Sequence, residues 1–273
     1  MSAPAVAPRR ADLARYGLWQ LRDYAINRGA PTLLGFGMLG TIVVLPLLKG
    51  LNRQLEAMPA RAMARLIAQH GSAEGVRAWM AHDVSKGFLN GFVGVVVFFG
   101  AVLAMQGLVS NDRRLGFYRF LFSKPLSPAR YYGQAFLLHW AGFMIVVMML
   151  GVLYGAFVEP VLTPTFLTIV AAVFLLYAGL GFLMTALVRF DWLALVVALF
   201  VARILWDAFE RSESVFARLL YLLPPIHRTG AVYSALFGGT PIPWPTVTWI
   251  SGYGALAVLA GLLVLRTQRL AVP

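Results

Sequence analysis

Long apolar runs alternate with short polar connections along the whole chain. An α-helix needs about 20 predominantly apolar residues to cross the hydrocarbon core of a bilayer. Six runs approach or exceed that length, at residues 31–48, 88–109, 134–157, 165–188, 191–209 and 246–265. The pattern predicts an all-α, polytopic membrane protein with six transmembrane helices, in which residues 1–273 form a single transmembrane domain.

The distribution of Lys and Arg between the runs predicts the orientation of the helices. An even number of spans places both termini on one side, and the segments on that side contain 13 Lys and Arg residues against 9 on the other. Basic residues concentrate in cytosolic loops, and a long loop such as residues 50–87 counts less toward this bias. We therefore expect both the N-terminus and the C-terminus in the cytosol.

The composition agrees with a membrane protein and narrows its chemistry. Hydrophobic residues make up 60% of the chain and charged residues 12%, far from the usage of soluble domains. The net charge of +12 is spread over the loops, which suits lipid headgroups and argues against nucleic-acid binding. The chain has no cysteine, and its first residues lack the pattern of a removable signal peptide.

No pattern in the sequence indicates catalysis or a bound cofactor. The histidines lie far apart and lack acidic neighbours at metal-ligand spacing. The glycine string at residues 35–40 matches a dinucleotide motif, but it lies inside an apolar run and is interpreted as small residues for close helix packing. The sequence contains no P-loop, so ATP hydrolysis is expected only in another polypeptide.

A basic segment, residues 111–134, separates the second and third runs. It carries five basic residues against one acid, so we expect an ordered loop outside the bilayer. A proline disfavours the helical conformation in the residue before it, so Pro125 predicts the end of a first helix running from Asp112 to Phe122. Ser127 is a favourable N-cap and Pro128 a favourable first residue, which predicts the start of a second helix.

The first of these helices is expected to have two apolar faces. Leu115, Tyr118 and Phe122 share one face, which we expect to pack against the membrane domain. Phe117 and Phe120 lie on the opposite face. A helix that rests on lipid needs only one apolar face, so the second face predicts a protein partner.

The basic segment resembles the cytosolic loop after the second span of ABC-2 type transporter permeases. The resemblance rests on an acidic and arginine pair, a glycine, a Ser-x-Pro-x-Ser pattern and the next helix start, here Asp112-Arg113, Gly116, Ser123-Lys124-Pro125, Ser127 and Gly133-Gln134. Arg114 and Gln134 depart from the family, which usually has glutamate and lysine there.

The resemblance implies a function and a set of partners. In this family the loop, here residues 110–133, holds the coupling helix that binds a cytosolic ABC ATPase subunit. A second permease subunit, identical or different, completes the membrane part, and the complex exports its substrate across a bacterial cytoplasmic (inner) membrane. The implied coupling residues are Asp112, Arg113, Gly116, Phe117, Phe120, Ser123, Pro125 and Ser127.

Two other classes of function stay open at this point. One is a non-transporting membrane subunit that anchors or assembles a larger complex. The other is a membrane enzyme, which is less favoured because the sequence shows no paired histidines within a span, no nucleophile elbow and no clustered aspartates.

Three segments outside the runs carry predictions of their own. Residues 11–28 mix basic and aromatic residues and predict an N-terminal interfacial helix that lies on the membrane surface. Residues 50–87 predict two short helices over the outer face, broken at His70-Gly71-Ser72. Residues 212–245 contain two apolar pieces that are each too short to span.

The fifth run contains charges, because Arg203 and Asp207 lie one helical turn apart within it. They are either a pair that satisfies itself near the outer end of the helix or part of a substrate pathway. Two G-x-x-x-G strings, at residues 87–91 and 151–155, fit motifs for contact between helices.

Overall fold

The computed structural model describes residues 10–116, 127–188, 191–209 and 223–267. These residues form helices joined by turns, with no strand among them, which confirms the all-α prediction. Five helical segments in the described part are long and apolar enough to cross a membrane: Ala30–Glu56, Ala73–Arg114, Pro128–Phe157, Pro164–Leu187 and Trp244–Thr267. The fifth predicted run, residues 191–209, forms helix α9 (Asp191–Phe209), which is not one of these five segments.

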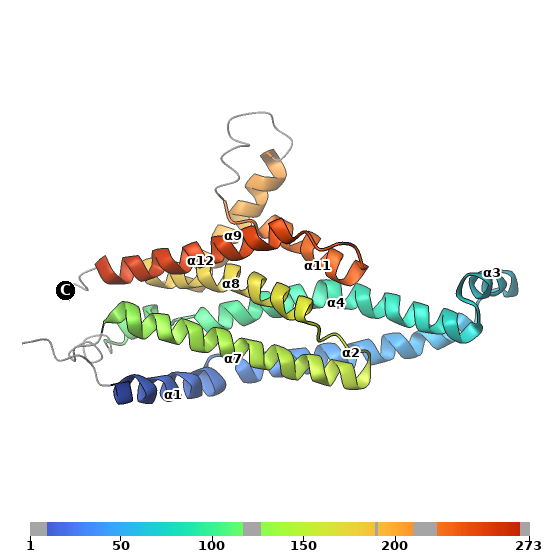
Figure 1. The fold of residues 1–273 in the computed structure, drawn as a ribbon, viewed down its shortest axis with the longest axis horizontal. Helices are drawn as coiled ribbons and strands as arrows, with labels where there is room; N and C mark the ends of the chain where they lie inside the picture. The colour runs from blue at the N-terminus through green and yellow to red at the C-terminus, as the bar shows by residue number, and fades with distance from the viewer. Residues whose placement is uncertain (1–9, 117–126, 189–190, 210–222, 268–273) are drawn as a thin grey trace, which may run out of the picture.

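The long helices lie side by side along one axis (Figure 1). They are α2 (Ala30–Glu56), α4 (Ala73–Met105), α7 (Pro128–Phe157), α8 (Pro164–Leu187) and α12 (Trp244–Thr267). Helix α8 lies at the centre and packs against α4, α7 and α12. The stacked rings of Phe143 and Phe174, with centroids 4.0 Å apart, join α7 to α8. We call the end of the bundle where α7 begins and α8 ends the α1 end.

The closest helix contact joins α8 to α12 through two glycines. A Cβ atom on Gly254 would lie 2.5 Å from the carbonyl oxygen of Leu175, and a Cβ on Gly179 would collide with the carbonyl of Gly254. Such backbone approach requires residues without side chains at the contact. Of the four glycines in the two G-x-x-x-G strings, Gly87 and Gly91 face open space, so they make no such contact within the described residues.

At the opposite end, α2 and α4 extend beyond the other helices and carry α3 (Ala60–His70) at their tip (Figure 1). The predicted break is confirmed, since Gly71 has a φ of 84° and the Ser72 hydroxyl accepts from the Gly75 amide as the N-cap of α4. The prediction of two short helices in residues 50–87 is wrong. Only α3 is separate, because apolar contacts between the flanking parts, Leu51, Leu55 and Val76, continue the α2–α4 pairing.

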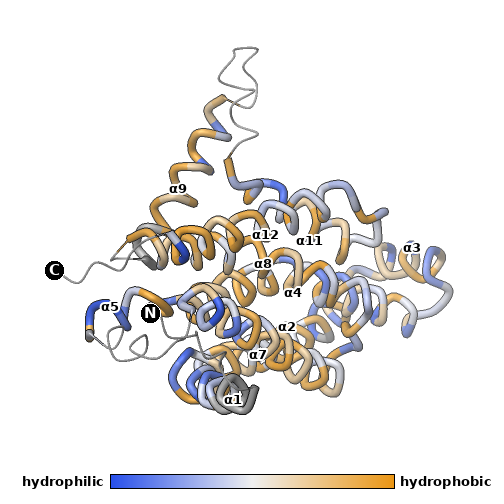
Figure 2. The backbone as a smooth tube through the Cα atoms, turned by 60° about the vertical axis from the view of Figure 1, so that its left-hand side comes forward, coloured by the Kyte–Doolittle hydropathy of each residue, from blue (hydrophilic) through white to orange (hydrophobic). Residues whose placement is uncertain are grey.

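Helix α1 (Arg10–Asn27) lies lengthwise beside α7 rather than across the end of the bundle (Figures 1 and 2). Its interfacial position stays a prediction from the sequence. Helix α1 packs against α7 through its inner face, where Tyr24 is 3% exposed and its ring fills the space left by the missing side chain of Gly142. Gly29, with a φ of 86°, separates α1 from α2.

Helix α9 diverges from the bundle (Figure 1). Its main contacts among the described residues are with α8 and with the short helix η2 (Ile226–Arg228), where the rings of Trp206 and His227 stack with centroids 3.5 Å apart. A further short helix, α11 (Thr229–Gly238), packs against α4 and α8 and ends at Gly239. This agrees with the prediction that residues 212–245 contain no complete span, although residues 212–222 lie outside the described part.

Candidate functional site: a polar cavity at the α1 end

A cavity of about 460 Å³ opens among α1, α7 and the short helix α5 (Ser110–Arg114). Its walls combine charged, amide and aromatic side chains, including Trp19, Gln20, Asp23, Arg28, Asp112 and His139. Helix α5 follows α4 after a turn, and Thr185 near the end of α8 fixes its position by accepting from the amides of Val109 and Ser110, each at 3.3 Å. The cavity therefore lies level with the last turn of α8.

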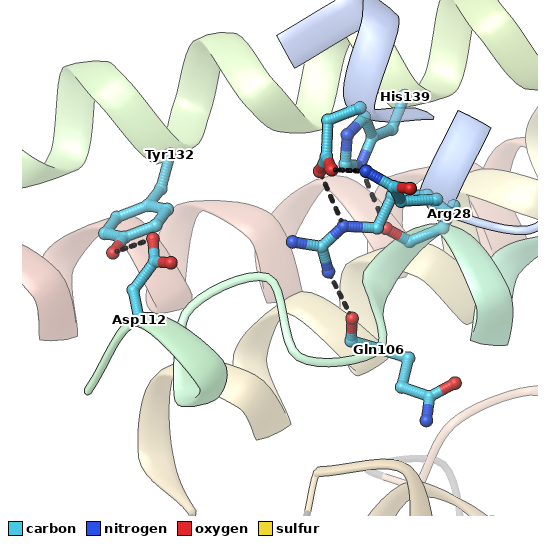
Figure 3. Close-up of polar contacts among 8 residues, drawn as sticks. Arg28, Gln106, Asp112, Tyr132 and His139 are labelled. Atoms are coloured by element: carbon cyan, nitrogen blue, oxygen red, sulfur yellow. Dashed lines mark hydrogen bonds and ion pairs between the residues drawn. The ribbon is translucent and has the colours of Figure 1, made fainter. Parts of the chain in front are cut away.

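Arg28 connects α1 with the end of α4. Its Nε donates to Asp23 Oδ2 at 2.9 Å, and its Nη1 donates to the carbonyl oxygen of Gln106 (Figure 3). Asn27 donates to the other carboxylate oxygen of Asp23 at 2.9 Å. Burial acts to raise the pKa of the Asp23 carboxyl, but the hydrogen bonds from Arg28 and Asn27 outweigh it, so the pKa of Asp23 is lowered.

Asp112 and Tyr132 join the two ends of the basic segment. The Tyr132 hydroxyl donates to Asp112 Oδ2 at 3.0 Å, and Tyr132 itself is fully buried (Figure 3). Asp112 belongs to α5, before the residues outside the described part, and Tyr132 belongs to the first turns of α7, after them. This hydrogen bond therefore fixes the base of the loop at residues 110–133.

His139 forms the floor of the cavity. It is 1% exposed, and its Nδ1 lies 2.9 Å from the carbonyl oxygen of Ala104, so Nδ1 carries the hydrogen and donates it (Figure 3). Its ring packs against Tyr24 with centroids 5.2 Å apart. Gln20, on the neighbouring wall, donates from Nε2 to the carbonyl oxygen of Tyr131, while its buried Oε1 has no hydrogen-bond partner among the described residues.

The structure corrects the predicted first helix of the loop. Helix α5 ends at Arg114, and Gly116 has a φ of 75°, a left-handed conformation that ends a helix and that glycine adopts at little cost. Leu115 is 59% exposed, so it does not pack against the membrane domain as expected. Asp112, Arg113 and Gly116 all lie in this short stretch.

The start of the second helix is confirmed. Helix α7 begins at Pro128 with Ser127 in the N-cap position, although the Ser127 hydroxyl makes no capping hydrogen bond. The remaining predicted coupling residues, Phe117, Phe120, Ser123 and Pro125, lie outside the described residues. Their role in coupling therefore stays a prediction from the sequence.

Arg203 and Asp207 are brought together on α9, with Arg203 Nε donating to Asp207 Oδ2 at 2.9 Å. Their side chains are 54% and 52% exposed. This geometry agrees with a pair that satisfies itself, and it lies on a different element from the cavity.

Sequence reasoning found Asp112 but missed its neighbours in the cavity. His139 was considered only as a metal ligand, and Asp23 and Arg28 only as part of a surface helix. One signal pointed to the site, because His139 is the only ionisable residue of the third run other than tyrosine and ionisable residues inside spans usually serve a function. No group of three or more metal-ligand residues exists in the described part of the chain.

Comparison with known proteins identifies no relative: no protein-family model, no curated protein and no solved structure matches the chain.

Proposed function

We propose that this chain is the permease subunit of an ATP-binding cassette transporter of the ABC-2 type, which forms a membrane pathway for export. Its ATPase is a separate cytosolic subunit, because the chain itself contains no P-loop. A second permease subunit completes the pathway. In this proposal the α1 end faces the cytosol of a bacterial cell and both termini lie on that side.

The observation that carries the proposal is the hydrogen bond from Tyr132 to Asp112 at the base of the basic loop. A loop that transmits force from an ATPase needs fixed ends, since a loose connection would absorb the motion. Asp112 is also the residue that matches the acidic position of the family motif. Fixed loop ends and motif therefore coincide at one residue.

The exposed pair on α9 supports a second subunit in the membrane. Charged side chains in contact with lipid are costly, and those within membrane segments usually face protein or water. Arg203 and Asp207 are about half exposed on a helix that diverges from the bundle. A second permease subunit against α9 would shield this pair from the hydrocarbon core.

The competing proposal is a non-transporting subunit that anchors a larger complex. The genomic neighbourhood separates the two, because a permease of this kind is expected beside a reading frame with a P-loop ATPase. The anchor is favoured if no such frame is present.

Transport by reconstituted subunits tests the proposal directly. The chain and the neighbouring ATPase would be co-expressed and placed together in lipid vesicles, then assayed with panels of lipids, drugs and glycans. We expect ATP-dependent movement of one substrate class, abolished when the ATPase P-loop lysine is substituted. ATP hydrolysis that proceeds equally with and without the chain, and moves none of the candidates, would contradict the proposal.

A further inference from the structure

The polar cavity presents a cation and an anion on facing walls, and each has unused hydrogen-bonding capacity. Arg28 uses Nε for Asp23 and Nη1 for Gln106, while Nη2 makes no hydrogen bond to any described residue. Figure 3 shows this third nitrogen pointing toward the space beside Asp112 and Tyr132. A guanidinium nitrogen with free N–H groups is a strong donor to phosphate or carboxylate oxygens.

Asp112 supplies the opposite charge. One of its oxygens accepts from Tyr132, and the other has no hydrogen-bond partner among the described residues. An ionised carboxylate oxygen in this position suits a donor that carries positive charge, such as an ammonium group. Gln20 adds a further acceptor, since its Oε1 is also unpartnered in the described part of the chain.

The charges of the walls argue against a ligand of single sign. A simple anion bound to Arg28 would also face the carboxylates of Asp23 and Asp112, which line the same cavity. A simple cation bound to Asp112 would face Arg28. A ligand that carries both charges, with its anionic end toward Arg28 and its cationic end toward Asp112, satisfies both walls at once.

The mouth of the cavity favours a ligand that reaches it from the membrane. Trp19 and Leu115 belong to the lining, yet they are 60% and 59% exposed, so they present apolar surface beside the opening. The cavity is level with the last turn of α8, where the apolar sequence of this helix ends, and lipid headgroups are expected at the end of such a span. Tryptophan is enriched at this depth because its ring is apolar and its N–H is polar.

We propose that this cavity binds a zwitterion in which a primary ammonium is linked to a phosphate, the head group of a phosphatidylethanolamine. The phosphate accepts hydrogen bonds from Arg28, and the ammonium donates to Asp112. The same chemical group also exists free as phosphoethanolamine. The assignment concerns ligand binding and holds whether or not the chain is a transporter subunit.

Lipid titration of the purified chain tests this assignment. Native mass spectrometry in detergent would compare phosphatidylethanolamine, phosphatidylcholine and phosphatidylglycerol of equal chain length. We expect phosphatidylethanolamine to bind at least about tenfold more tightly, since a trimethylated nitrogen has no N–H to donate and glycerol has no positive charge. Competition by free phosphoethanolamine at similar concentration would assign the soluble source, and displacement only by the full lipid would assign the lipid.

Matched substitutions distinguish lipid binding in the cavity from lipid binding by charges elsewhere on the surface. Asp112→Asn keeps an oxygen that accepts from Tyr132 and should lower the affinity for phosphatidylethanolamine about tenfold or more. Arg28→Gln should also lower the affinity for phosphatidylethanolamine about tenfold or more. Because this substitution leaves Asp23 without its cation, its lipid affinity is interpreted only if the variant remains folded. The controls are Asp83→Asn and Arg22→Gln, two exposed positions away from the cavity. Equal affinity for the three lipids, or unchanged affinity in Asp112→Asn, would overturn the assignment.

Discussion

Asp23 and Arg28 show how two side chains hold a helix in place. The pair is only about one-fifth exposed, at 21% and 17%, and Arg28 extends the connection to the backbone of Gln106. A charge-assisted hydrogen bond at such burial contributes more than an exposed ion pair, because solvent screens it less. The connection between the end of α1 and the end of α4 therefore depends on the ionisation of Asp23.

This dependence predicts a loss of stability in acid. The folded-state pKa of Asp23 is lowered, so its contribution is present above the unfolded-state pKa of about 4 and is lost as the pH falls through the folded value. Asp23→Asn should therefore lower the melting temperature at pH 7, and the difference from wild type should shrink below about pH 4. Melting of both proteins in detergent across this range is the measurement. A difference that is the same at both pH values would contradict the role given to Asp23.

In contrast to the substitution of Asp23, a double substitution of Arg203 and Asp207 is expected to leave stability nearly unchanged. Exposed pairs one turn apart contribute little stability, about 0.3–0.5 kcal/mol on a helix. Arg203→Met with Asp207→Leu removes both charges together, so we expect the protein to fold and transport as before. Arg203→Met alone should be less stable than the double variant, because it leaves the Asp207 charge alone in a segment that is proposed to lie in the membrane. A folded double variant without transport would assign the pair to the substrate pathway.

At the scale of elements, the α8–α12 contact is the most sensitive to added volume. Gly254→Val would force its side chain into the backbone of α8 at Leu175, so we expect a loss of about 3 kcal/mol in stability. Gly252 lies half a turn away and has open space around its Cβ position. Gly252→Val is therefore the control and should melt close to wild type. Equal melting of both variants would show that the helices do not pack in this way.

The sequence predicts a helix well where residues within or next to that helix determine where it begins and ends. The apolar runs mark the five long helices, Gly71-Ser72 marks the break before α4, and Ser127-Pro128 marks the start of α7. The sequence predicts the position of a helix poorly where a contact with another helix determines it. Tyr24 draws α1 against α7 only because Gly142 lies opposite, and periodicity within α1 carries no information about that glycine.

The cavity illustrates the same limit at the functional site. Asp112 stands out in the sequence because it is the single acid in a basic segment and because the family motif marks it. Its hydrogen-bond partner Tyr132 lies 20 residues away, and Arg28 and His139 come from other helices. Only the packing of α1, α5 and α7 brings these residues to one cavity.

At the scale of the whole molecule, the proposal fixes which end of the bundle faces the cytosol. Single cysteines can be placed at Ala3, Ser72 and Ala271, because the chain has no cysteine of its own. Ser72 is exposed at the junction of α3 and α4, at the far end from α1, so it should react with an impermeant thiol reagent on intact cells. Reaction of cysteines placed at Ala3 or Ala271, with protection of the cysteine at Ser72, would show that the orientation is the reverse of the proposed one and that the loop is not in the cytosol.

The proposed function requires that an ATPase subunit binds through the loop at residues 110–133. Phe117 and Phe120, which lie outside the described residues, are the aromatic anchors expected from the sequence, and buried aromatic anchors often contribute more than about 2 kcal/mol each. Phe117→Ala with Phe120→Ala should weaken ATPase binding roughly a thousandfold, at about 1.4 kcal/mol per tenfold. The matched control removes two exposed rings on the helices, with Phe99→Ala and Phe200→Ala.

Copurification of the neighbouring ATPase with each permease variant, in one detergent, tests this claim most directly, with melting of each permease alone as the check on folding. We expect wild type and the helix control to retain the ATPase, while the loop variant loses it and remains folded. A loop variant that retains the ATPase at wild-type stoichiometry and still transports would show that this loop does not couple the chain to an ATPase.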